Sequence, residues 1–418
     1  YGDEIAPETR AYVQASRIRA GRAMMLTGAA AVIFALVAVG ALFQWRVARQ
    51  QTSLALHNFG VAREAVRGVV FDVVQGLADV SGMRLDSLRT ILGTVQKAAD
   101  KLSDTAPDDA ELLRTRGAMF DNFARMYAHV GDVVSARASA DQAVAIMDGL
   151  VRTRSQDVRV ESDLGIVMTT RGTIDSQAGD VSAARRRFEE ALRLARIGAS
   201  RAPDDAELRR RLLAPLNWLG DVRLTLGDFS GARDAYREQF EVARRELAAD
   251  AADPEGRMRD AQHTALFSMG FLGLESGDLD LAERSYLDAY AIARGLAEEF
   301  PGRLGMQRGL SVMLANLANL DLKRGRKKEA VARYDEAVAI ERRLLREDPQ
   351  NMERLRNLGV TLEARGNGAY AQSDWPGALA AYQEELDIFR GLVARNSLDM
   401  RNQRSVAVAL ANLAAVRR

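Results

Sequence analysis

The chain has 418 residues, more than one hydrophobic core normally organises, so several domains or a linear repeat array are expected. Its 58 lysines and arginines nearly balance its 57 aspartates and glutamates, and the net charge of +1 argues against a nucleic-acid partner held by bulk charge. There is no cysteine, which excludes disulfides, thiolate nucleophiles and cysteine-containing zinc sites.

The N-terminal part of the chain predicts a membrane anchor. Residues 1–22 form a polar, basic juxtamembrane tail, and residues 23–45 carry no charge. At about 1.5 Å per helical residue, this run is long enough to cross a hydrocarbon core of about 30 Å. A cleaved signal peptide is the alternative, but the run is longer than the apolar part of a typical one. Because the chain starts at Tyr1 and not at methionine, we expect it to be a fragment of a longer protein.

The residues around and within this run predict its orientation and a contact surface. Arginines are more numerous before the run than just after it, so the positive-inside rule predicts a single-pass protein of a bacterial inner membrane, with a cytoplasmic N-terminus and periplasmic repeats. Small residues line one face of the run, at Gly28, Ala31, Ala35 and Ala38. Such a seam favours a homodimer, although an alanine-rich composition would produce the same seam without that purpose.

Residues 46–103 predict a helical connector. Apolar residues recur there at steps of three and four, as expected of helices with one buried face. Ser81 and Gly82 interrupt the pattern and predict two helices. The first of them continues directly from the predicted membrane span, so the connector is interpreted as a stalk.

Residues 104–418 predict an array of helices separated by regularly spaced turns. Most turn residues are 24 positions apart, and glycines suited to helix C-caps alternate with prolines that end one helix and open another. Asp follows several of the glycines, where it suits the N-cap of the next helix. We therefore predict an all-α domain of six antiparallel helix pairs plus a C-terminal helix. The turn residues are Pro107, Gly131, Ser155, Gly179, Pro203, Gly227, Pro254, Gly277, Pro301, Gly325, Pro349, Ser373 and Ser397.

A second pattern runs through these six pairs with a period of 48 residues, lengthened once to 50. Five residues after each intra-pair turn stands an alanine, and four residues later there is usually an aromatic side chain. A fixed period of this size is typical of a solenoid, in which each unit packs on its neighbours. The alanines are Ala136, Ala184, Ala232, Ala282, Ala330 and Ala378. The aromatic residues are Phe188, Tyr236, Tyr286, Tyr334 and Tyr382, and Ala140 takes the first slot.

Aligned on the alanines, the units resemble the tetratricopeptide repeat (TPR). That family has a small residue at its eighth position, a small residue at its twentieth and an aromatic residue at its twenty-fourth. The eighth position here is Ala124, Gly172, Gly220, Gly270, Ala318 and Gly366, and the alanine column fills the twentieth. The period exceeds the usual one of about 34 residues, so both helices carry extra turns. The resemblance implies a right-handed superhelix that binds a protein or peptide along its concave face.

The positions that would face this groove vary from unit to unit. The Lys and Asn pattern by which some family members bind a C-terminal carboxylate is missing, which disfavours that ligand. Phe267 and Phe271, one helical turn apart, offer an apolar contact, or alternatively fill the core between repeats. The candidate groove residues are Asn217, Asp221, Phe267, Phe271, Asn319 and Asn367.

The order of parts also resembles the C-terminal half of certain bacterial signalling proteins. Those proteins carry an N-terminal Toll/interleukin receptor (TIR), caspase-like or kinase domain, followed by a membrane span and long repeats. This resemblance implies an alternative function, in which the chain is the sensor half of a receptor whose effector domain precedes Tyr1.

Motifs for catalysis, phosphate binding or metal binding do not occur in the sequence. The three histidines are isolated, and adjacent acidic residues face different ways on their helices. A basic run at residues 323–328 spans a turn, where neighbouring acids favour ordinary solvation. We therefore predict a membrane-anchored, TPR-like scaffold for protein–protein interaction, without enzymatic activity, cofactor or nucleic-acid partner.

Overall fold

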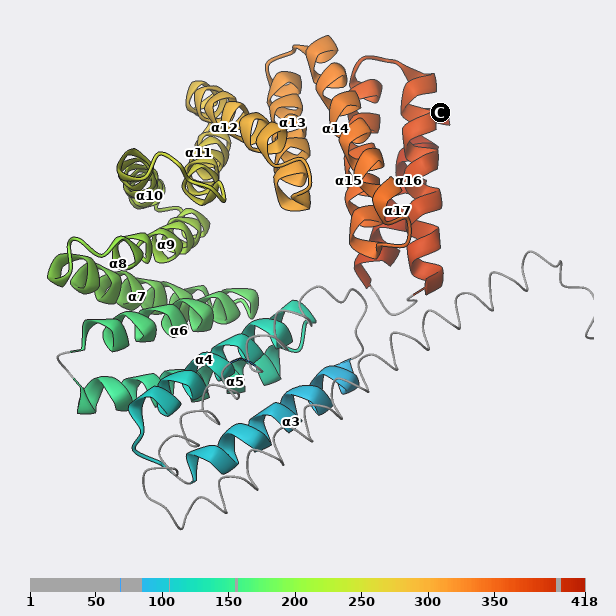
Figure 1. Ribbon diagram of the computed structural model, residues 1–418. Coiled ribbons are helices and arrows are strands. Elements are labelled where there is room, and N and C mark those ends of the chain that lie inside the picture. The colour runs from blue at the N-terminus through green and yellow to red at the C-terminus, as the bar shows by residue number, and fades with distance from the viewer. Residues whose placement is uncertain (1–67, 69–84, 105, 155–156, 396–399, 418) are drawn as a thin grey trace, which may run out of the picture. The chain divides into compact units, whose positions relative to one another are not determined.

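The computed structural model describes residues 68, 85–104, 106–154, 157–395 and 400–417. Within these ranges all regular secondary structure is helical (Figure 1), so the predicted all-α array of helix pairs is confirmed. The chain divides into two compact units, residues 1–153 and residues 154–418. The right-handed superhelix and the domain boundaries at residues 22, 45 and 103 stay predictions.

The first unit contains α3 (Leu85–Ser103) and the first helix pair, α4 (Ala110–His129) with α5 (Val133–Thr153). Helix α3 corresponds to the second predicted helix of the connector; nearly all of the first predicted helix lies outside the described residues. Leu88 and Leu92 bury one face of α3, and Phe120 and Phe123 of α4 are also buried, with their rings edge to face at 6.0 Å. This unit is held together by ordinary apolar packing.

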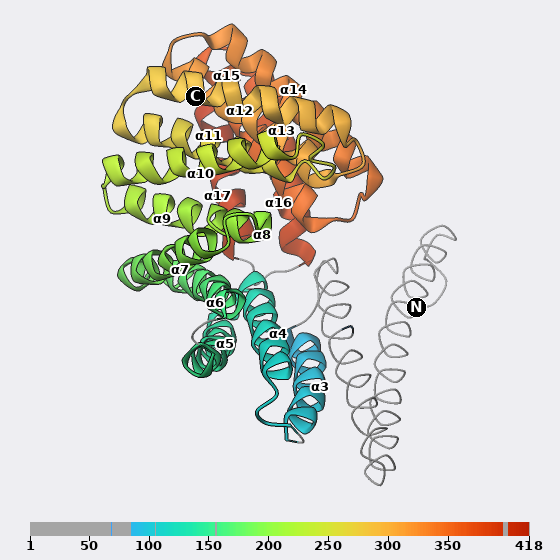
Figure 2. The same cartoon turned by 60° about the vertical axis from the view of Figure 1, so that its left-hand side comes forward.

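The second unit continues the array with five more helix pairs and a last helix. Within this unit, each helix packs mainly on its neighbours in the chain, and Figures 1 and 2 show these pairs following one another in chain order. The second to sixth pairs are α6 (Val158–Gln177) with α7 (Val181–Arg201), α8 (Ala206–Arg210) and α9 (Leu213–Thr225) with α10 (Phe229–Ala249), α11 (Arg257–Ser276) with α12 (Leu279–Glu299), α13 (Leu304–Lys323) with α14 (Lys327–Glu347), and α15 (Met352–Ala371) with α16 (Trp375–Arg395); α17 (Met400–Arg417) follows.

The turn inside each pair has a left-handed residue at the predicted position. Glycine adopts this conformation without a steric penalty, whereas Ser373 of the sixth pair adopts it at φ 63° with a side chain attached. The following residue often caps the next helix, as Asp180 does by accepting a hydrogen bond from the Ala183 amide at 2.9 Å. The five glycines are Gly131, Gly179, Gly227, Gly277 and Gly325.

The first helix of the third pair differs from the single helix expected there. It divides into α8 and α9 at Arg211 and Leu212. In an unbroken helix, Pro215 would lack the N–H that bonds to the Arg211 carbonyl, and its ring would collide with that carbonyl. The break places Pro215 in the first turn of α9, where a proline is tolerated. The spacing of the turn residues predicts a single helix here, because it takes no account of a proline between the turns.

The predicted location in a bacterial inner membrane is corrected by the structure. In the described part of the chain, no helix combines the length and the apolar character needed to cross a membrane. Crossing requires about 20 mostly apolar residues, whereas these helices bury one side and carry charged side chains on the other, as α7 and α14 do. Residues 1–22, the predicted span at 23–45 and its Gly28, Ala31, Ala35 and Ala38 seam lie outside the described residues.

Candidate peptide-binding surface

The alanine and aromatic columns form the contact between the two helices of each pair. All six alanines and all five aromatic side chains are buried, each with an exposed fraction of 2% or less. The aromatic ring of the second helix lies on the small residue of the first, so that a Cβ added to Gly220 would stand 2.3 Å from Tyr236 Cε1. Gly172, Gly270 and Gly366 face their own aromatic partners in the same way. The eighth position is therefore small because a ring occupies the space of its side chain.

Three of the predicted groove residues hold the hydroxyl groups of these buried tyrosines. Tyr236 donates a hydrogen bond to Asp221 Oδ1 at 2.7 Å in the third pair. In the fifth and sixth pairs, Tyr334 donates to Asn319 Oδ1 at 2.5 Å, and Tyr382 donates to Asn367 Oδ1 at 2.7 Å. In each case the acceptor precedes its tyrosine by 15 residues. These side chains satisfy the polar end of a ring whose remainder is apolar.

The fourth pair breaks this rule. Phe271 occupies the slot of the acceptor, and the hydroxyl of Tyr286 is buried with no hydrogen-bond partner in the described structure. Burial raises the pKa of Tyr286, so its hydroxyl stays protonated. The Phe271 side chain is 43% exposed. A polar contact inside the pair has thus been exchanged for an aromatic ring at the surface.

The structure separates the two phenylalanines of the sequence prediction. The Phe267 ring lies 5.9 Å from the Tyr286 ring and packs against the core of the fourth and fifth pairs. Phe267 is thus partly buried against the core, in keeping with one of the two interpretations left open, whereas Phe271 is a surface residue.

The last predicted groove residue, Asn217, lies beside Asp221. Its Nδ2 donates to Asp221 Oδ2 at 3.4 Å, so this carboxylate accepts hydrogen bonds on both oxygens. Burial nevertheless raises the pKa of Asp221, and the Tyr236 hydroxyl opposes this effect.

Other exposed apolar residues on the first helices were missed by the sequence analysis. Trp218 is partly exposed and stacks on Phe188 at 6.2 Å, while Val312 and Val360 lie on α13 and α15. The sequence could have indicated these residues, because they are apolar at positions that the helical periodicity assigns to the solvent-facing side of the helix. Together with Phe271 they define what we call the first-helix surface.

Two arginines of the basic run at residues 323–328 pair with neighbouring acidic residues. Arg324 pairs with Asp280 at 2.6 Å, and Arg326 pairs with Asp321 at 2.7 Å and with Glu283 at 2.5 Å. The ion pairs to Asp280 and Glu283 join the fourth and fifth helix pairs, whereas the Arg326–Asp321 ion pair lies within the fifth. Residues in the described ranges also bring together no group of three or more histidines and acids suited to a metal ion.

Comparisons with known proteins agree in fold class but are distant. No family model matches the chain, and no curated protein matches it in sequence. Among solved structures, BtubC (BKLC) from P. vanneervenii has a TM-score of 0.46 at 19% identity, over 62% of this chain and 92% of that one. A tetratricopeptide repeat protein from Parabacteroides merdae has a TM-score of 0.42 at 12% identity, over 84% and 99%. A Rap protein complexed with competence and sporulation factor has a TM-score of 0.43 at 13% identity, over 91% and 97%.

The contacts inside the chain itself support its likeness to the tetratricopeptide repeat. The small residue beneath each ring, the buried alanine and the left-handed turn recur in successive pairs. The chain is a TPR-like helical repeat protein with extended helices.

Proposed function

We propose that the chain is a protein-interaction scaffold that binds a peptide segment of its partner along the first-helix surface, with Phe271 as the apolar anchor. The observation that supports this proposal is that Phe271 replaces the polar acceptor of the buried tyrosine in the fourth pair. Three other pairs place an Asp or Asn in this slot and satisfy a buried tyrosine, whereas the fourth pair leaves Tyr286 without an acceptor.

Replacing the polar acceptor by Phe271 lowers the stability of the fold in two ways. A buried hydroxyl without a partner costs about 1–3 kcal/mol, and an exposed phenyl ring gains little from burial. Local rules of a fold are typically broken where a site serves function, and aromatic side chains are enriched in the centres of protein interfaces. These two considerations favour a binding role for Phe271 over a structural one.

The neighbouring asparagines offer a complementary contact. Because Asn319 and Asn367 use Oδ1 to accept the tyrosine hydroxyls, their amide orientation is set and Nδ2 is left as a donor. Both residues are exposed. Amide donors on the first helices of the next two pairs suit an extended peptide, whose carbonyl groups they bond while an apolar side chain of the peptide lies against Phe271.

A single substitution separates binding from stability. Phe271→Asn restores the acceptor found in the fifth and sixth pairs, so we expect the free energy of unfolding to rise by about 1 kcal/mol. The same change removes the ring, so peptides selected from a random library on the full chain should bind at least about tenfold more weakly. Binding is measured by fluorescence polarisation and stability by chemical denaturation.

Leu287→Asn is the matched control, because it also removes an exposed apolar side chain of the fourth pair, but from the second helix α12 and therefore outside the first-helix surface. We expect it to leave the binding of the selected peptides within about twofold of the unchanged chain. Equal binding by the Phe271→Asn protein would refute the proposed anchor.

The alternative role as the sensor half of a bacterial receptor, the absence of enzymatic activity and the predicted homodimer stay predictions, because none of them concerns a contact in the described residues.

A further inference from the structure

Second helices of neighbouring pairs are connected by a repeated arginine–glutamate ion pair. Arg196 of α7 contacts Glu238 of α10 at 2.7 Å, and Arg342 of α14 contacts Glu384 of α16 at 2.6 Å. Both pairs span 42 residues and occupy equivalent positions of the repeat. We call this contact the inter-pair bridge.

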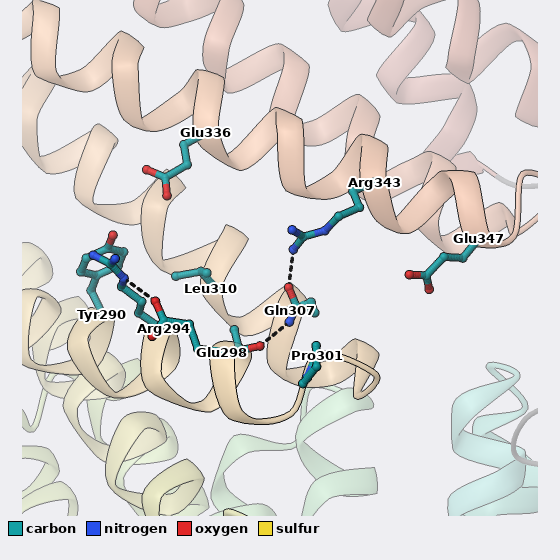
Figure 3. Close-up of a pocket in the computed structure, with 10 residues that line it drawn as sticks. Tyr290, Arg294, Glu298, Pro301, Gln307, Leu310, Glu336, Arg343 and Glu347 are labelled. Carbon is teal, nitrogen blue, oxygen red and sulfur yellow. Dashed lines mark hydrogen bonds and ion pairs between the residues drawn. The ribbon is translucent and has the colours of Figure 1, made fainter.

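The bridge is open between α12 and α14. The equivalent residues are Arg294 and Glu336, but Arg294 turns to Glu298 on its own helix, where the two groups are 2.9 Å apart. Glu336 has no ion-pair or hydrogen-bond partner in the described residues, and it is exposed. Figure 3 shows Glu336 on one side of a cleft and the Arg294–Glu298 pair on the other.

The cleft has a volume of about 660 Å³, within the range of small-ligand and side-chain pockets. Its floor contains the buried Leu310, and the ring of Tyr290 forms part of the wall. The buried Gln307 is fully used: its Nε2 donates to the Ala297 carbonyl at 2.6 Å, and its Oε1 accepts from Arg343. Glu336 is therefore the lining carboxylate at the position of the open bridge. Of the buried residues near it, Leu310 is apolar and Gln307 already has its hydrogen-bond partners.

We propose that this cleft binds an arginine side chain of a partner protein, whose guanidinium takes the place that an arginine of the chain itself fills at the closed bridges. Carboxylates receive a guanidinium through two parallel hydrogen bonds, and the aliphatic stem packs on apolar side chains such as Tyr290 and Leu310. The site is lined by α12, α13 and α14 and does not include Phe271, so it extends the proposed function to a second site.

A titration of the full chain with the peptide acetyl-Ala-Ala-Arg-Ala-Ala-amide tests the proposal, with binding followed by ligand-observed NMR. We expect saturable binding that falls at least about tenfold when norleucine replaces the arginine of the peptide, since norleucine keeps the apolar stem without the charge. We also expect Glu336→Gln to weaken binding by at least about tenfold. The exposed position of Glu336 should leave the thermal melt of this variant unchanged.

Asp288→Asn is the matched control for charge. Asp288 occupies the equivalent position on α12, where the bridge is also open because Arg244 pairs with Glu241 on its own helix. If bulk charge held the peptide, Asp288→Asn and Glu336→Gln would weaken binding equally, and that result would overturn the proposal. We expect Asp288→Asn to change binding by less than about twofold.

A second variant tests the mechanism of the open bridge. Glu298→Gln removes the partner of Arg294 and frees its guanidinium to reach Glu336, so it should weaken binding of the arginine peptide by competition. Unchanged binding in both the Glu336→Gln and the Glu298→Gln proteins would also overturn the proposal. Phe271→Asn should not affect this peptide, which distinguishes the two sites.

Discussion

The fourth helix pair and its neighbours bury the same tyrosine in different ways. In the third, fifth and sixth pairs the hydroxyl is bonded to an Asp or Asn one helix away, whereas the fourth pair encloses an equally buried Tyr286 beside an exposed Phe271. The apolar part of the contact is unchanged, since each ring still covers a small residue of the first helix. The difference teaches that the ring positions the two helices, while its hydroxyl partner is free to vary.

Removing the whole ring should have the largest effect in both pairs, and the loss in the fourth pair should be smaller only by the contribution of the hydroxyl. Tyr236→Ala and Tyr286→Ala each leave a cavity where a fully buried ring stood, so we expect losses of roughly 3–5 kcal/mol in both, measured by chemical denaturation. A much smaller loss in the fourth pair would mean that Tyr286 is packed less well than its neighbours and would break the comparison.

The sixth pair extends the comparison to a buried charge. Glu385 is fully buried, with no partner for either oxygen among the described residues, at a position that is Ala143, Ala191, Ala289 and Ala337 in four other pairs. Burial, and secondarily the Glu363 carboxylate, raise the pKa of Glu385 to about 8.

Because the folded chain holds this proton more tightly than the unfolded chain, stability should fall as pH rises from about 4.5 to about 8, by up to about 1.4 kcal/mol per pH unit from this group. Denaturation at pH 6, 7 and 8 measures the slope. Glu385→Gln provides the control, since the difference between the two proteins isolates this carboxyl from the other titrating groups. Parallel slopes would contradict the prediction.

Removing only the hydroxyl should have the smallest effect and separate the pairs most clearly. Tyr236→Phe takes a donor from Asp221 and should lower the free energy of unfolding by about 1–2 kcal/mol. Tyr286→Phe removes a hydroxyl that has no partner, so it should be neutral or stabilising by up to about 1 kcal/mol. Equal losses would show that Tyr286 has an acceptor in solution.

The sequence predicted the repeat better than it predicted the surface. Glycines and Ser373 at the turns, and the alanine and aromatic columns, reflect local backbone geometry and close packing, which recur wherever the unit recurs. Asp221, Asn319 and Asn367 were assigned to ligand binding, because the sequence does not show that each lies under a tyrosine of the next helix. Pro215 inside an expected helix could have predicted the break between α8 and α9, but the regular spacing of the turns favoured a single helix there.

By itself, the sequence determined an all-helical array of pairs, its register and the residues in its packing columns. Those properties follow from residue size and conformational preference, which act over a few turns of helix. Only the tertiary structure decided that Phe271 is exposed while Phe267 is partly buried against the core, that Tyr286 lacks an acceptor in the described residues, and that Arg294 turns away from Glu336. These outcomes depend on side chains of different helices competing for the same partners, and that competition is settled only when the helices pack together.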